Sequence, residues 1–172
     1  MEAVDAVGAA IPQDTPLFVR YESSQLSSDY IPYTAWHRIS GTEWLEESDE
    51  PSWRIEDTAR IAPILAEHGV DLRDVSGGGN DSRQKIRFGS EYQVPFATAA
   101  KEATGGRLLV GTVGGLSGGK VAQHILESNR ADVIFVGRQF QKNPGQVWAM
   151  ADEIGVQLHH ANQIGWGFAG RA

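Results

Sequence analysis

The sequence contains no cysteine, which excludes disulfide bonds, thiol nucleophiles and cysteine metal sites. Basic residues are also in the minority: 15 Lys and Arg stand against 22 Asp and Glu, for a net charge of −7. A nucleic acid or an anionic membrane surface needs a basic face, so neither is expected as a partner. No apolar run is long enough to span a bilayer, and the start shows no signal-peptide pattern. We therefore expect a cytoplasmic protein.

What is present has the composition of one globular domain. The chain has 172 residues, of which 41% are hydrophobic and 22% charged, enough to build a hydrophobic core. A single domain is expected over residues 1–172. The histidines show no ligand spacing, and no pair of carboxylates has a reason to act together, so we assign neither metal ligands nor catalytic residues.

From residue 53 onward, short apolar runs alternate with helical patterns, which is typical of repeated βα units and a parallel sheet. Strands are expected at 17–19, 70–75, 108–113 and 132–136, and helices at 56–68, 95–104, 119–128 and 143–154. Pro63 lies inside the first of these helices, where it removes a backbone hydrogen bond, so a kink or an early break is expected there. Four units fall short of the eight that close a (β/α)₈ barrel of about 250 residues. The chain therefore looks like the back half of a larger fold.

Two of the predicted strands end in glycine. Gly114 and Gly115 follow the strand at 108–113, and Gly137 and Arg138 follow the strand at 132–136. Because neighbouring parallel strands end at the same edge of a sheet, backbone N–H groups, a helix dipole and a guanidinium would converge on one anion. This spacing predicts a phosphate cradle.

These residues allow two other interpretations. Residues 114–120 match G-x-x-x-x-G-K, but the next residue is Val121, which has no hydroxyl for Mg²⁺, so nucleotide hydrolysis is disfavoured. Alternatively, the glycines only allow tight strand-to-helix turns and Arg138 is an ordinary surface residue. The phosphate cradle and the plain turn both stay open.

A cluster of acidic residues precedes the first regular βα unit. Its members are Glu43, Glu46, Glu47, Asp49 and Glu50. Such a run of like charges is expected to form a solvated loop.

Six motifs, in order along the chain, closely resemble the C-terminal half of the old yellow enzyme family, in particular its bacterial and fungal NADPH dehydrogenases. They are S-W-R-I-E-D-T-A-R at 52–60, E-H-G-V-D-L at 67–72, G-S-E-Y-Q-V-P-F at 89–96, V-G-G at 113–115, V-G-R-Q-F at 136–140 and N-Q-I-G-W-G-F at 162–168. The match covers nearly all of the chain except residues 21–37. A string of motifs in order is far more specific than any one of them.

The resemblance implies an FMN-dependent (β/α)₈ barrel that takes hydride from NADPH and passes it to an activated alkene such as an enone. The four units here would be strands five to eight, a half TIM barrel. Gly114 and Gly115 would bind the FMN phosphate after strand seven, and Gly137 and Arg138 after strand eight. The family's substrate-binding pair and proton-donating tyrosine belong to its first half, which this chain lacks. We therefore expect a fragment without activity of its own.

The family's flavin-ring arginine lies in a motif like F-V-R-I-S, which this chain carries in two pieces. F-V-R stands at 18–20 and R-I-S at 38–40, separated by the Ser- and Tyr-rich residues 21–37. Arg20-Tyr21 can be encoded by AGG-TAC and His37-Arg38 by CAC-AGG. These codons would place GT at the first junction and AG at the second, the two ends of an intron, and joining across them restores a single arginine. We interpret the insertion as a retained intron. Either Arg20 or Arg38 would then be the arginine whose charge stabilises the reduced flavin.

An alternative from another class is a non-catalytic protein that binds a phosphorylated ligand or completes a barrel with a second chain. Unpaired first and last strands would favour homo-oligomers through their edges, or the tail at 162–172 would be an arm onto a neighbour. Arg73 also departs from the family, which has an aliphatic residue there, and its burial would be costly without a partner.

Overall fold

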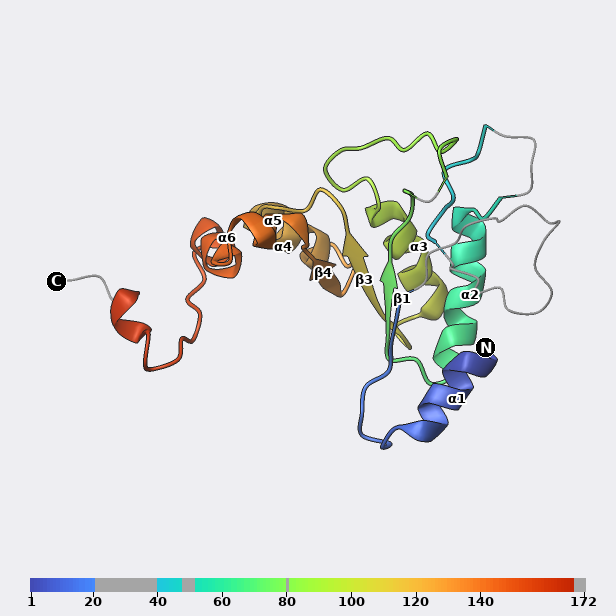
Figure 1. The fold of residues 1–172 in the computed structure, drawn as a ribbon, viewed down its shortest axis with the longest axis horizontal. Helices are drawn as coiled ribbons and strands as arrows, with labels where there is room; N and C mark the ends of the chain where they lie inside the picture. Colours follow the sequence, from blue (N-terminus) through green and yellow to red (C-terminus); the bar gives the residue numbers. More distant parts are fainter. Residues whose placement is uncertain (21–39, 48–51, 80, 169–172) are drawn as a thin grey trace.

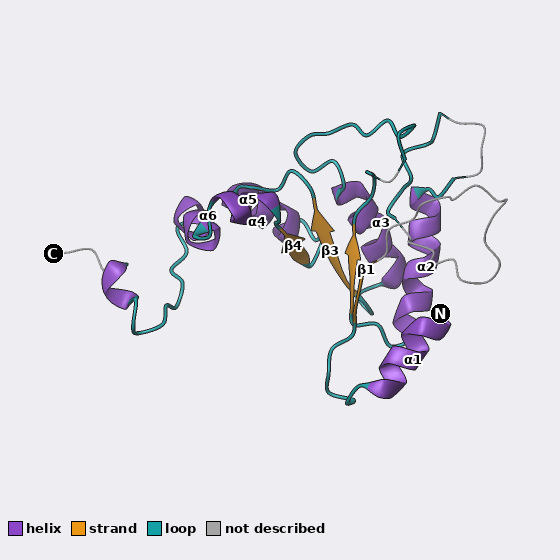
Figure 2. Cartoon of the chain, viewed as in Figure 1, coloured by secondary structure: helices purple, strands orange, loops and turns teal. Residues whose placement is uncertain are grey.

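The computed structural model describes residues 1–20, 40–47, 52–79 and 81–168 (Figures 1 and 2). The elements in order are α1 (Glu2–Ala10), β1 (Phe18–Arg20), α2 (Ile55–Glu67), β2 (Leu72–Val75), α3 (Val94–Thr104), β3 (Leu109–Val113), α4 (Gly119–Glu127), β4 (Val133–Phe135), α5 (Arg138–Lys142), α6 (Gln146–Ile154) and a 3₁₀ turn η1 (Gly165–Gly167). The predicted insertion at 21–37 and Arg38 lie outside these residues.

The four strands form one parallel sheet in the order β1-β2-β3-β4. Helices α2 and α3 pack against each other, and α3 lies on β2 and β3 (Figure 1). The α/β fold with four parallel βα units, predicted from the alternation of patterns, is confirmed. Its correspondence to strands five to eight of a TIM barrel stays a prediction.

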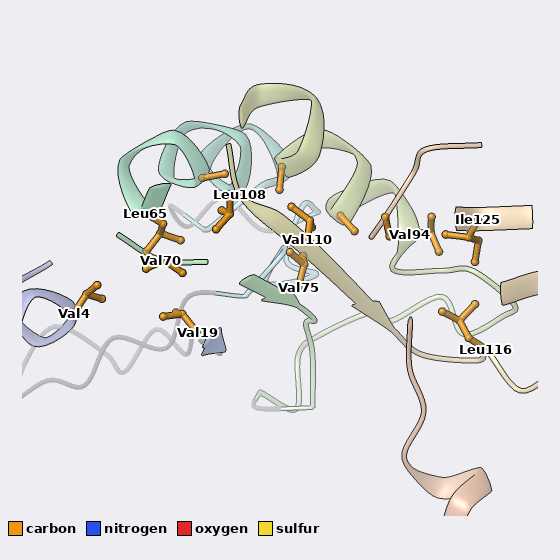
Figure 3. Close-up of a cluster of buried hydrophobic side chains, with 14 residues drawn as sticks. Val4, Val19, Leu65, Val70, Val75, Val94, Leu108, Val110, Leu116 and Ile125 are labelled. Atoms are coloured by element: carbon orange, nitrogen blue, oxygen red, sulfur yellow. The ribbon is translucent and has the colours of Figure 1, made fainter. Parts of the chain in front are cut away.

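The two faces of the sheet differ in what covers them. Val19 and Val110 belong to the buried cluster beneath the helices (Figure 3). The register aligns Phe18 with Leu72 and Leu72 with Leu109, in a row on the opposite face because successive side chains alternate. At the two ends of this row Phe18 is 62% exposed and Leu109 48% exposed. One face is therefore covered by helices and the other is partly open.

The core lies between the sheet and α2 and α3 (Figure 3). Small residues, Ala62, Ala97 and Ala100, are fully buried where the two helices approach each other. Leu65 and Val110 are 1% and 0% exposed, and burial of such side chains contributes about 1.5–3 kcal/mol each. This packing explains why α2 continues through Pro63, where a break was expected. The lost hydrogen bond is outweighed by burial of the helix's apolar stripe.

The last predicted helix is divided in the structure. Residues 138–142 form the short helix α5, which was not predicted, and α6 begins at Gln146 rather than beside Pro144. Between them, the Asn143 side chain accepts a hydrogen bond from the amide of Gly145 at 3.0 Å. Asn143 therefore closes a turn ahead of the helix instead of capping it.

The acidic loop is not uniformly solvated as predicted. Glu43 is 3% exposed, and its carboxylate accepts a hydrogen bond from the amide of Trp53 at 2.7 Å. Glu47 is exposed and pairs with Lys85, whose hydrogen bond lowers the pKa of the Glu47 carboxyl. Asp49 and Glu50 lie outside the described residues. Glu43 is a structural acid because a backbone amide satisfies its charge in the interior.

Thr58, in the first turns of α2, joins three parts of the chain. Its hydroxyl lies 2.9 Å from the carbonyl oxygen of Gly41 and accepts a hydrogen bond from the Trp53 indole at 2.9 Å. Its own carbonyl accepts a hydrogen bond from the Arg73 guanidinium at 3.0 Å. Arg73 is only 1% exposed, so this contact meets part of the cost of its burial.

The chain returns to the sheet at Gly41, in phase with β1. The amide of Gly41 donates to the carbonyl of Ser76 at 2.8 Å. Arg20 is the register partner of Asp74. If β1 continued without interruption, the third residue after Arg20 would donate to the Ser76 carbonyl. In this chain the donor is Gly41, the twenty-first residue after Arg20, which leaves 18 extra residues between them. Joining Arg20 directly to Ile39 would therefore continue one strand in register.

We predict that deleting residues 21–38 leaves the fold intact. The Gly41–Ser76 hydrogen bond survives in this variant because the ladder stays in phase. Deleting residues 21–37 is the matched control: its one-residue slip turns every side chain to the other face or forces a bulge. Hydrogen exchange at the Gly41 amide and urea unfolding should separate the two. Equal protection and stability in both variants would contradict the continuous register.

We also predict that Thr58→Val destabilises the fold by about 1–3 kcal/mol, because it leaves the half-buried Trp53 indole and two carbonyl groups without the hydroxyl. Thr58→Ser keeps the hydroxyl and is expected to cost about 1 kcal/mol, the loss of one methyl group. Urea unfolding measures both. A Val variant no less stable than the Ser variant would show that the hydroxyl contacts do not hold the loop.

Candidate functional site

The predicted site residues that the structure describes gather at one edge of the sheet. Arg20 is the last residue of β1, Gly114 and Gly115 follow the end of β3, and Gly137 and Arg138 stand two and three residues after β4. Because all four strands are parallel, these positions share the carboxyl edge, where ligands bind in such folds. Arg38 lies outside the described residues.

Gly114 and Gly115 are required by the chain's own packing. Both have positive φ, +106° and +70°. A Cβ atom at Gly114 would lie 2.6 Å from the Tyr92 ring, and one at Gly115 would lie 2.4 Å from the carbonyl oxygen of Gly89. The interpretation as a plain turn therefore accounts for both glycines without a ligand.

Gly137 presents the opposite case. Its φ of −104° is not in the left-handed region, and no atom of the described residues lies within 4 Å of the position of a Cβ atom. Arg138 follows it, is exposed, and makes no ion pair with any described residue. Neither a positive φ nor a close neighbour among the described residues explains this glycine. An unobstructed backbone beside an exposed guanidinium is a place where an anion can approach.

The N-terminus of α4 does not contribute to the cradle as expected. The amide of Gly119, the first residue of α4, donates to the Glu153 carboxylate at 2.6 Å. A Cβ atom at Gly119 would lie 2.3 Å from the carbonyl oxygen of Met150 in α6. The favourable end of this helix dipole is thus already used by a carboxylate of the same chain.

Gln146 links the turns that follow β3 and β4. It is 6% exposed, and its side-chain amide donates to the carbonyl of Ser117 at 2.8 Å. Its side-chain oxygen accepts hydrogen bonds from Gln139 at 3.2 Å and Asn143 at 3.3 Å. These bonds hold the two glycine-bearing turns relative to each other. Sequence reasoning missed Gln146, because a polar residue at a helix start carries no signal of its burial.

Arg20 forms an ion pair across the sheet. Its guanidinium lies 3.1 Å from the carboxylate of Asp74, its register partner on β2. The Arg20 side chain is 53% exposed, whereas the Asp74 side chain is 7% exposed. The site therefore has an accessible cation at the β1 end and another, Arg138, at the β4 end.

A cavity of about 420 Å³ lies between the loop at 40–47 and the segment at 83–87. Its walls include the rings of Trp44 and Phe96, whose centroids are 5.3 Å apart. Arg83 on its rim hydrogen-bonds Asp81 and lowers the pKa of that carboxyl to about 2. The cations at this rim are thus largely matched by acids. The sequence showed no periodic signal for this cavity.

No protein-family model matches the chain. Curated relatives do: NADH:flavin oxidoreductase FG08077 of Gibberella zeae is 41% identical over 173 residues, covering 99% of this chain and 39% of that protein. NADPH dehydrogenase of Geobacillus sp. is 35% identical over 170 residues, 97% of this chain and 42% of that protein. NADPH dehydrogenase of Bacillus pumilus is 35% identical over 162 residues, covering 94% of this chain and 40% of that protein. The chain spans about two fifths of the length of these relatives.

A solved structure, DHODH in complex with ferulenol from Eimeria tenella, is similar over 69% of this chain and 32% of that chain, with 16% identity and a TM-score of 0.46. A likeness at this level adds nothing to the argument.

The chain is thus a homologue of flavin- and nicotinamide-dependent oxidoreductases over almost its whole length. The resemblance to the old yellow enzyme family that the six motifs carried is confirmed. Among the helices of the described ranges, none has the length and apolar character needed to cross a membrane.

The two kinds of glycine predict opposite effects on stability. Gly115→Ala should lower the free energy of unfolding by more than about 1 kcal/mol, because the new Cβ meets a backbone oxygen at a positive φ. Gly137→Ala should leave stability unchanged or raise it by a few tenths of a kcal/mol. Thermal and urea unfolding measure both. An unstable Gly137→Ala variant would mean that the fold itself requires this glycine.

Proposed function

We propose that the chain carries the phosphate-binding end and one ring-facing arginine of an FMN site in an NADPH dehydrogenase of the old yellow enzyme type. In this proposal the four strands are strands five to eight of a (β/α)₈ barrel. The chain covers two fifths of its relatives' length, so the activity of the whole protein is part of the proposal.

The observation that carries the proposal is the pair Gly137 and Arg138. The bare backbone at Gly137 lets a phosphate oxygen approach its N–H, and the neighbouring guanidinium supplies a charge-assisted hydrogen bond. No described part of the chain needs the glycine or neutralises the arginine. The contribution of Gly114 and Gly115 stays a prediction, since packing against the 89–93 segment already accounts for both glycines without a ligand.

The spacing of the strands suits an elongated ligand. Arg20 ends β1 and the Gly137 turn follows β4, at the two sides of the sheet, three strand spacings or about 14 Å apart. One end of FMN can then contact Arg138 while its ring lies towards Arg20. The chemistry supplied by a bound FMN is the transfer of hydride from NADPH to the β-carbon of an enone-type substrate. The residues of this chain bind and orient, and none is proposed to donate a proton.

The alternative function, a non-catalytic phosphate-ligand or barrel-completing protein, stays a prediction without a finding behind it, as does self-association through the strand edges. Enzyme and alternative separate by experiment. Yellow protein that oxidises NADPH supports the enzyme, whereas phosphate-ligand binding without flavin supports the alternative.

The test compares FMN with riboflavin, which has the same ring and no phosphate. We predict that Arg138→Gln weakens FMN binding about ten- to a hundredfold, the loss of one charge-assisted hydrogen bond, and leaves riboflavin binding unchanged. Gly137→Ala should weaken FMN binding in the same selective way without loss of stability. Quenching of flavin fluorescence gives both dissociation constants.

Arg107→Gln is the matched control, because Arg107 is an exposed arginine just before β3, at the opposite edge of the sheet. It should leave both dissociation constants unchanged. Equal effects of Arg138→Gln on FMN and riboflavin would contradict a phosphate contact, and a wild-type chain that binds neither flavin would overturn the proposal.

A further inference from the structure

We propose that Asp74 is a positioning residue, which fixes the guanidinium of Arg20 over the open face of the sheet and neutralises part of its charge there. The ion pair between Asp74 and Arg20 is observed in the structure. Its proposed effect on a flavin rests on the proposed function.

The register places the two residues as direct partners. Arg20 on β1 is opposite Asp74 on β2, so both side chains leave the sheet on the same face. Val19 and Val75 leave on the other face and enter the core beneath the helices. The contact of 3.1 Å between Arg20 and Asp74 therefore lies on the face that the helices do not cover.

Burial is unequal in the two partners, and this sets their roles. The Asp74 side chain is 7% exposed, so its position is fixed by the sheet, whereas the Arg20 side chain is 53% exposed. The next residue in the row is Gly111, whose missing Cβ leaves room for the Phe135 ring. Burying a carboxylate is costly, and the ion pair with Arg20 offsets part of that cost, so moving Arg20 away would lower the stability of the fold. Asp74 is the anchor and Arg20 the accessible group.

The electrostatic consequence has a definite sign. A lone arginine beside a flavin ring favours the negative charge that reduction adds to the ring. A carboxylate paired with that arginine cancels part of its field. Removing the carboxylate's charge should therefore favour the reduced flavin over the oxidised one.

The first experiment needs no flavin. A double-mutant cycle with Arg20→Gln and Asp74→Asn, read by urea unfolding of the full chain, should give a coupling of about tenfold in the folding equilibrium constant. In particular, Asp74→Asn should recover part of the stability that Arg20→Gln loses. A coupling near one overturns the proposal. If Asp74→Asn does not fold, Arg20→Lys replaces it: this variant keeps the charge and should be more stable than Arg20→Gln, and equal stability overturns the proposal.

The second experiment uses FMN-loaded protein. Asp74→Asn should raise the ratio of affinities for reduced over oxidised FMN about tenfold, equivalent to a potential about 30 mV higher for a two-electron couple. Glu102→Gln, which removes an exposed carboxylate in the last turn of α3, should leave the potential unchanged. Coupling with no change in potential would make Asp74 merely structural and overturn the positioning role. A wild-type chain that retains no FMN overturns the proposed function instead, and the cycle alone then decides whether Asp74 fixes Arg20.

Discussion

The ladder between β1 and β2 is the constraint on which the functional edge of the sheet depends. It sets Arg20 opposite Asp74, and Gly41 rejoins it at Ser76 in the same phase. Thr58 then ties that returning segment to α2, and Arg73 ties α2 to β2. Because register fixes which side chains face the helices, a slip here would exchange the core valines with the polar pair. The polar edge and the hydrophobic core are thus set by one alignment.

The same edge contains glycines of two kinds, and their difference separates packing from binding. Gly114, Gly115 and Gly119 each have a close neighbour from the chain itself, and the amide of Gly119 also has an internal carboxylate as its partner. Only Gly137, among the glycines at the ends of the described strands, has neither a close neighbour nor a positive φ. A glycine that the fold does not need is the stronger indication of a ligand. The phosphate end of the proposed site therefore rests on the β4 turn.

The sequence predicted those features that depend on local patterns. Strand order, helix faces and the glycine-ended strands follow from hydrophobic period and turn residues, and the motifs predicted the family. Burial of polar groups was not predictable, because it depends on distant partners. Glu43 has a charge typical of a loop residue, and its burial depends on the hydrogen bond from the Trp53 amide. Gln146 hydrogen-bonds both Ser117 and Asn143, which lie in two turns that are far apart in the sequence. The expected anion contact at the N-terminus of α4 was not predicted correctly for the same reason: the Gly119 amide donates to Glu153, which lies 34 residues away in the sequence.

The open face of the sheet determines how a bound flavin would gain its affinity. Phe18 and Leu109 expose apolar surface on this face, but they are the first residues of β1 and β3, so a ring at the carboxyl edge borders this surface from one side at most. Burial of one face gives a smaller gain than enclosure, and Asp74 offsets part of the attraction of Arg20 for charge on the ring. The phosphate carries two negative charges, and Arg138 beside it makes no ion pair with any described residue, so the phosphate gains the strongest contacts on binding. Affinity in this chain should therefore depend more on Arg138 than on any residue facing the ring.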